Sequence, residues 1–127
     1  MSDYSYHMTL AAGLLPYAFA GLAKFSGGRA YDNHDPRAFL EGAQGRQRRA
    51  NNAQLNSFES FPLFAVGVLV MHQRHAADLD VNLLHALAGG YLLARVLYGW
   101  AYITDRATLR SLVWAVGFFL SASLYLV

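Results

Sequence analysis

The chain has 127 residues, of which 55% are hydrophobic and only 14% are charged. The charged share is about half that of an average soluble domain, so the composition favours a single-domain membrane protein. Cysteine is absent, which excludes a disulfide framework, a thiolate metal site and a cysteine nucleophile, and a net charge of +2 is too small and too unevenly placed to indicate nucleic-acid binding.

The first predicted element is a transmembrane helix at residues 5–26. Residues 4–23 contain no Asp, Glu, Lys or Arg. A stretch of about 20 such residues forms about 30 Å of helix, which is enough to cross the hydrocarbon core of a bilayer. A cleaved signal peptide would begin with basic residues and have a shorter apolar region, whereas Asp3 is the only early charge. We therefore expect this helix to be retained.

A polar segment follows at residues 24–47, and it is rich in charged residues and glycine. Within it, Asp35 followed by Pro36 is typical of a helix N-cap and a first-turn proline, so a short helix is expected to start there. We interpret the whole segment as a loop at the membrane surface and not as a separate domain.

Three further transmembrane helices are predicted at residues 48–73, 81–103 and 108–127. In the first of these, the apolar run at residues 61–71 is too short to cross a membrane alone, so the polar residues before it must lie in the membrane zone. The expected fold is therefore an all-α membrane protein, with one domain at residues 1–127 that forms a bundle of four transmembrane helices.

The distribution of Lys and Arg predicts the orientation of this bundle. The loops after the first and third helices carry most of these residues, whereas the loop on the opposite side offers only Arg74. By the positive-inside rule, the basic loops are cytoplasmic and both termini lie outside. We expect a multi-pass integral membrane protein, located in the inner or cell membrane if the source is bacterial.

Polar side chains fall within three of the predicted spans, in the half nearer the basic loops. They are Arg49, Asn52, Asn56 and Glu59 in the second helix, Arg95, Tyr98 and Tyr102 in the third, and Arg110 and Ser111 at the start of the fourth. Charges in a membrane must be paired or face a wet cavity. An ion pair between Glu59 and Arg95 could serve only to hold two helices together, but one such pair does not explain the whole set, which could bind a ligand with several charges.

Two separated motifs contain these residues. Residues 49–64 read RAxxAxxNxxExFPxF, and residues 95–102 read RxxYxxxY, followed by LRS at residues 109–111. In this order they resemble the MAPEG family (membrane-associated proteins in eicosanoid and glutathione metabolism). The segment YDNHDPR at residues 31–37 further resembles the first loop of bacterial members.

The resemblance implies a four-helix bundle assembled as a homotrimer, with glutathione bound as a co-substrate between neighbouring subunits near the cytoplasmic surface. It implies that Asn56 and Glu59 contact the glutathione backbone and that Arg95, Tyr98 and Tyr102 flank the peptide. It also implies that the arginine of the Arg110–Ser111 pair acts on the thiol. Lys24 lies near a position where the family often has an arginine.

The charges in the spans also suit this ligand. Glutathione has two carboxylates and one ammonium, so Arg49, Arg95 and either Arg37 or Lys24 suit the carboxylates, and Glu59 suits the ammonium or an amide N–H. A guanidinium beside the sulfur favours the thiolate, and a serine hydroxyl can donate a further hydrogen bond. The expected catalytic residues are Arg110 and Ser111, and the expected glutathione-binding residues are Arg49, Asn52, Asn56, Glu59, Arg95, Tyr98 and Tyr102.

We therefore hypothesise a glutathione transferase or peroxidase that acts on lipophilic electrophiles, which would enter from the bilayer between the first and fourth helices. Ser60 follows Glu59 where some eicosanoid-producing members have tyrosine, which favours a broader detoxification role, or no such role, over a specific eicosanoid activity. The alternative is a non-catalytic trimeric membrane protein whose buried ion pairs are structural, and a quinone or haem protein is a third possibility. Conjugation, hydroperoxide reduction and isomerisation all start from the same thiolate and stay open.

Other residues carry simpler expectations. Small residues should mediate helix contacts, namely Ala86, Gly90 and Ala94 on the third helix and Gly117 and Ser121 on the fourth. Aromatic residues should face lipid or the membrane interface, namely Tyr91, Phe118, Phe119 and Tyr125. The five histidines are scattered, and no metal site is expected.

Overall fold

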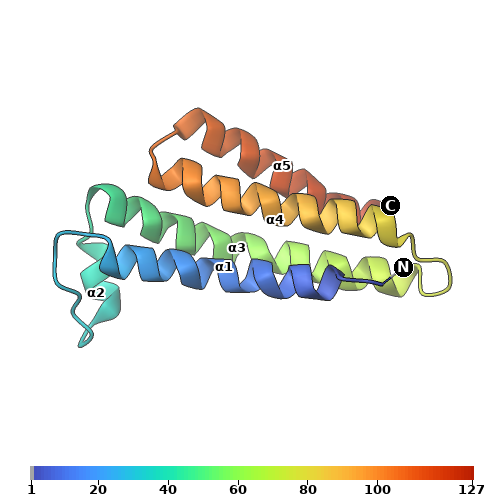
Figure 1. Ribbon diagram of the computed structural model, residues 1–127, viewed down its shortest axis with the longest axis horizontal. Coiled ribbons are helices and arrows are strands. Elements are labelled where there is room, and N and C mark those ends of the chain that lie inside the picture. The colour runs from blue at the N-terminus through green and yellow to red at the C-terminus, as the bar shows by residue number, and fades with distance from the viewer. Residues whose placement is uncertain (1) are drawn as a thin grey trace.

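The protein is helical throughout its secondary structure, in a computed structural model that describes residues 2–127 (Figure 1). The elements are α1 (Ser5–Phe25), α2 (Pro36–Glu41), α3 (Gly45–Arg74), α4 (Val81–Ile103) and α5 (Ala107–Leu126). All except α2 are long and apolar enough to cross a membrane, which confirms the expected all-α bundle with four membrane-spanning helices. The largest departure from the predicted ranges is the start of α3, which begins at Gly45 and not at residue 48.

The four long helices form two pairs that pack side by side. α1 packs along α3, α4 packs along α5, and both α3 and α4 contact the helices of the other pair. Figure 1 shows both termini at one end of the bundle, with α2 and the α4–α5 turn at the other end. The basic loops therefore share one end, as the charge pattern predicts, and the assignment of that end to the cytoplasm stays a prediction.

Local sequence determines where two of the helices begin. The carboxylate of Asp35 accepts a hydrogen bond from the backbone N–H of Ala38 at 3.2 Å, and Pro36 is the first residue of α2. At the start of α4, Asp80 accepts from the backbone N–H of Leu83 at 3.0 Å. Both side chains satisfy N–H groups that have no partner within the helix.

The buried side chains form two apolar clusters, one in each half of the bundle. The cluster nearer the termini contains Phe64, Val68, Met71, Leu84, Tyr91 and Leu124, and the cluster nearer α2 contains Phe19, Ala23, Ala50, Ala53, Tyr98 and Ile103. The expected lipid-facing position of Tyr91 is wrong, because its side chain is 1% exposed and its ring stacks on Phe64 at 3.9 Å. Tyr91 lies one turn before Arg95, so it shares the inward face of α4.

Small residues let α4 and α5 approach closely, as predicted. A Cβ at Gly90 would lie 3.0 Å from a methyl group of Leu120, and a Cβ at Gly117 would lie 3.7 Å from that of Ala94. The third predicted small residue of α4, Ala86, is exposed, so the contact begins one turn later than expected.

Polar side chains tie the N-terminal residues to the ends of α3 and α4. Asp3 lies 3.1 Å from Nε2 of His72 and 3.5 Å from Nε2 of His85, and it accepts a hydrogen bond from the backbone N–H of Ser5. Partial burial acts to raise the pKa of Asp3, but the hydrogen bonds from Ser5 and the nearby imidazole of His72 outweigh it and hold this pKa below its ordinary value.

A close contact between α1 and α4 provides a test of the packing. Gly99 faces Phe19, whose side chain is buried, and a Cβ at Gly99 would overlap the Phe19 ring. We expect Gly99→Ala to lower the free energy of unfolding by about 1–3 kcal/mol, because the ring must move within a packed core. Thermal unfolding in detergent would measure the change.

The control is Gly21→Ala, since a Cβ there meets no atom within 4 Å. Equal melting temperatures for the two variants would contradict the packing.

Candidate functional site

Arg95 is a buried guanidinium in the middle of the polar region. Its side chain is 2% exposed, and its Nη2 donates to Oδ1 of Asn56 and to Oγ of Ser57, both at 2.9 Å. Its guanidinium carbon lies 4.0 Å from the centre of the Tyr98 ring, and its Nε has no hydrogen-bond partner among residues 2–127. Within the same residues Arg95 forms no ion pair, so the alternative in which it pairs with Glu59 is not what the structure shows.

Two aromatic rings lie between the guanidiniums of Arg95 on α4 and Arg110 on α5. The Tyr98 and Tyr102 rings meet edge to face with centres 5.7 Å apart. The guanidinium carbon of Arg110 lies 4.6 Å from the centre of the Tyr102 ring. Ring faces attract cations, so these contacts orient both guanidiniums without neutralising them.

Two hollows open beside α5, and Trp114 lines both. The first has a volume of 230 Å³ and is lined by Asn56, Glu59, Ser60, Leu63, Trp114, Phe118 and Ser121. The second has a volume of 260 Å³ and is lined by Tyr98, Tyr102, Arg110, Ser111 and Trp114. Arg95 connects the two sets of residues, because it bonds Asn56 of the first and stacks on Tyr98 of the second. The structure thus brings together seven of the nine predicted site residues.

Arg49 does not join this group. Its Nε donates to the backbone carbonyl of Ile103 at 3.0 Å, and its side chain lines a hollow on the opposite side of α4, next to Phe19 and Trp100. The remaining predicted residue, Asn52, lies one turn before Asn56 on α3, is half-buried, and lines neither hollow beside α5.

A comparison with protein-family models matches residues 4–127 to the MAPEG family. The chain belongs to the MAPEG family. Comparisons with curated proteins and with solved structures gave no match. The family match covers nearly the whole chain and places it in a membrane protein family that is associated with glutathione in general.

Three residues of this MAPEG chain outside the predicted set form hydrogen bonds at the site, and other unpredicted residues line the hollows beside α5. Ser57 accepts from Arg95, and Ser60 lies 2.9 Å from the hydroxyl of Tyr91. A signal for Tyr91 was present, since it precedes Arg95 by one turn on the same face. Ser57 immediately follows Asn56. Its contact with Arg95 depends on the distance between α3 and α4, which the sequence does not give.

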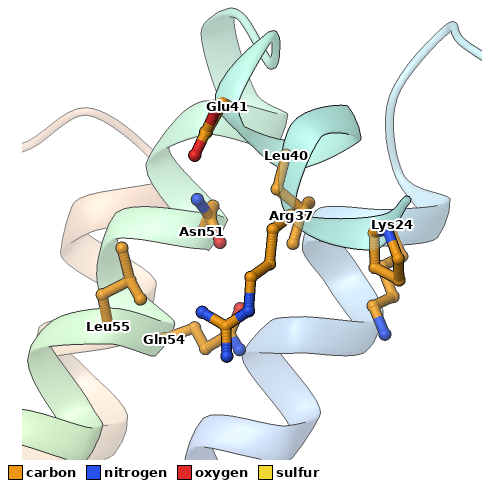
Figure 2. Close-up of a pocket in the computed structure, with 8 residues that line it drawn as sticks. Lys24, Arg37, Leu40, Glu41, Asn51, Gln54 and Leu55 are labelled. Atoms are coloured by element: carbon orange, nitrogen blue, oxygen red, sulfur yellow. The ribbon is translucent and has the colours of Figure 1, made fainter.

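A further hollow, of 300 Å³, lies where α1, α2 and α3 meet (Figure 2). Its charged lining residues are Lys24, Arg37 and Glu41, and the Arg37 side chain extends toward Gln54 in Figure 2. It shares no lining residue with the two hollows beside α5. No group of three His, Asp or Glu side chains in the described part of the chain could hold a metal ion.

The hydrogen bond between Ser60 and Tyr91 can be tested by a double-mutant cycle. We expect Tyr91→Phe to lower the free energy of unfolding by about 1 kcal/mol, because it removes one buried hydrogen bond and keeps the stacking on Phe64. Ser60→Ala should have a similar effect, and the double variant should lose little more than either single one. Chemical or thermal unfolding in detergent gives the three values. Tyr6→Phe is the control, as no hydrogen bond of the Tyr6 hydroxyl is found in residues 2–127, and fully additive effects would argue against the bond.

Proposed function

We propose that the chain is an integral membrane glutathione-dependent transferase or peroxidase that acts on lipophilic electrophiles. The observation that carries the proposal is the buried guanidinium of Arg95, which has no carboxylate partner among residues 2–127. An uncompensated charge in a membrane span is expensive and marks a functional site. A ligand anion beside the hollows next to α5 would compensate it, and the family's association with glutathione makes this tripeptide the first candidate.

The charges around the hollows match those of glutathione. Arg95 and Arg110 suit the two carboxylates or the thiolate, and Glu59, which is exposed and has no ion-pair partner in the described chain, suits the ammonium. Because Oδ1 of Asn56 accepts from Arg95, the amide nitrogen of Asn56 is left to donate to the peptide. Tyr98 and Tyr102 then form an aromatic wall. Arg49 and Asn52 have no assigned contact with the ligand in this proposal.

Arg110 and Ser111 are the proposed catalytic residues. A free thiol with a pKa near ~8.5 is mostly protonated at neutral pH, and a neighbouring guanidinium favours the thiolate. Both residues lie within the first five positions of α5, where the helix N-terminus adds a further positive potential. In conjugation, the thiolate sulfur forms a bond to the electrophilic carbon, the leaving group departs with the bonding electron pair, and the thiol proton passes to water.

A homotrimer is part of the proposal. The hollows beside α5 are open, and Trp114 and Phe118 are 41% and 42% exposed, so another surface is needed to close them. The basic hollow at Lys24 and Arg37 lies on the α1 side of the bundle, away from α5. Head-to-tail packing around a three-fold axis would bring that basic surface of one subunit to the α5 side of the next.

Glutathione binding tests the ligand assignment. We expect glutathione to raise the melting temperature of the detergent-solubilised protein, and calorimetry should show Glu59→Gln binding about tenfold more weakly, because one charge-assisted contact is lost. A glutathione analogue without the ammonium group should bind the wild type and Glu59→Gln equally. Asp105→Asn is the matched control for the loss of one exposed carboxylate. If the wild type does not bind glutathione, the proposal is wrong.

The rate of conjugation tests the role of Arg110. We expect Arg110→Ala to lower kcat/KM for an aromatic electrophile by about 100-fold or more and to shift its pH profile toward the ordinary thiol pKa near ~8.5, because the thiolate loses its cation. Arg110→Lys should recover part of both effects, and Arg48→Ala, an exposed arginine on α3, should change neither. An unchanged profile in Arg110→Ala would assign thiolate stabilisation to another group.

A further inference from the structure

The side of the bundle formed by α1 and α4 carries an apolar groove that the proposed function does not use. It has a volume of 590 Å³, and its apolar lining consists of Phe19, Leu22, Val96, Trp100 and Ile103. Val96 and Trp100 lie on the face of α4 away from Tyr98 and Tyr102, so α4 separates the groove from the hollows beside α5. From Val96 to Ile103 the groove follows about 10 Å of helix.

Three guanidiniums gather at the end of this groove nearest the basic loops. Arg46 and Arg49 line it, and Arg49 is held there by its bond to the carbonyl of Ile103. The guanidinium carbon of Arg106 lies 4.8 Å from the centre of the Trp100 ring. None of the three forms an ion pair with a carboxylate within residues 2–127, and Asp105 does not line the groove.

The polar lining therefore offers mainly positive charge. The hydroxyl of Thr104 donates to the backbone carbonyl of Trp100 at 2.7 Å, so its hydrogen is already used. The apolar lining is open to the surroundings, since Leu22, Val96 and Trp100 are each at least 40% exposed. A matching occupant has one strongly anionic end and a long apolar remainder, and it reaches the groove from the bilayer.

We propose that this groove is a binding site for an anionic phospholipid of the adjoining leaflet. The phosphate lies among the guanidiniums of Arg46, Arg49 and Arg106, and an acyl chain follows the apolar lining past Trp100 and Val96. Basic pockets between membrane-spanning helices recognise lipid headgroups in this way, through charge at the membrane surface and burial of the chain below it. A water-soluble phosphate would satisfy the guanidiniums but would leave the apolar part of the groove empty.

Native mass spectrometry of delipidated protein provides the first test, with phosphatidylglycerol and phosphatidylcholine of identical acyl chains as probes. We expect phosphatidylglycerol to be retained preferentially. Arg46→Gln/Arg106→Gln should reduce its affinity by about tenfold or more, the order expected for two guanidiniums at a membrane surface. The matched control, Arg37→Gln/Arg48→Gln, removes the same charge from the same end of the bundle and should retain the preference.

The apolar part of the groove needs its own variant. Val96→Trp fills the groove without changing any charge, and it should weaken phosphatidylglycerol binding while leaving glutathione binding unchanged. Equal retention of the two lipids, or a preference that persists in Arg46→Gln/Arg106→Gln, would overturn the proposal. So would glycerol phosphate stabilising the protein as much as the whole lipid, because the groove would then have no role.

A measurement on the wild type covers the case in which a variant fails to fold. Phosphatidylglycerol that carries a photoreactive diazirine in its acyl chain should crosslink to α1 and α4 peptides that contain Phe19, Leu22 or Val96, and unlabelled phosphatidylglycerol should compete. Crosslinks confined to other helices would place the lipid elsewhere and overturn the proposal.

Discussion

The structure depends on how the bundle accommodates the guanidinium of Arg95 inside a membrane span. Apolar clusters fill the two halves of the bundle, and Arg95 lies on α4 between Tyr91 of one cluster and Tyr98 of the other. The bundle supplies an amide oxygen, a hydroxyl and a ring face to this charge, but no carboxylate among residues 2–127. Neutral partners orient a guanidinium but leave its charge uncompensated. The surroundings of Arg95 therefore differ from a structural ion pair, in which a carboxylate would balance the charge.

Much of the fold could be predicted from the sequence because a membrane restricts which structures a spanning segment can form. A span needs a fixed length of apolar helix, so long stretches with at most one charge located α1, α4 and α5 closely, and the capping residue Asp35 located the start of α2. The start of α3 was less exact. No side chain caps it, and its first turns are polar and lie outside the apolar run, so neither signal applied there.

Most of the candidate side chains lie together as the sequence pattern indicated, but their contacts did not follow from that pattern. A period of 100° per residue identifies which side chains share a face, and on this basis Arg49 belongs with Asn56 and Glu59. It does not say where a long side chain turns, and Arg49 reaches the end of α4 on the other side. The same limit explains the pairing of Arg95 with Asn56 and Ser57 in place of Glu59, because partner choice depends on the distance between helices.

The position of α4 gives the two sides of the bundle different chemistry. Tyr98 and Tyr102 face the hollows beside α5, where the charges have both signs, whereas Val96 and Trp100 face a groove whose charged lining residues, within residues 2–127, are arginines. A zwitterionic peptide suits the first set and an anionic amphiphile suits the second, since charge complementarity selects partners more than it adds affinity. Arg49 bonds the carbonyl of Ile103, the residue after Tyr102, so the helix end shared by both sides is fixed by a side chain from the lipid-facing groove. The proposed peptide site at Tyr102 therefore adjoins a helix end that Arg49 holds from the opposite side of α4.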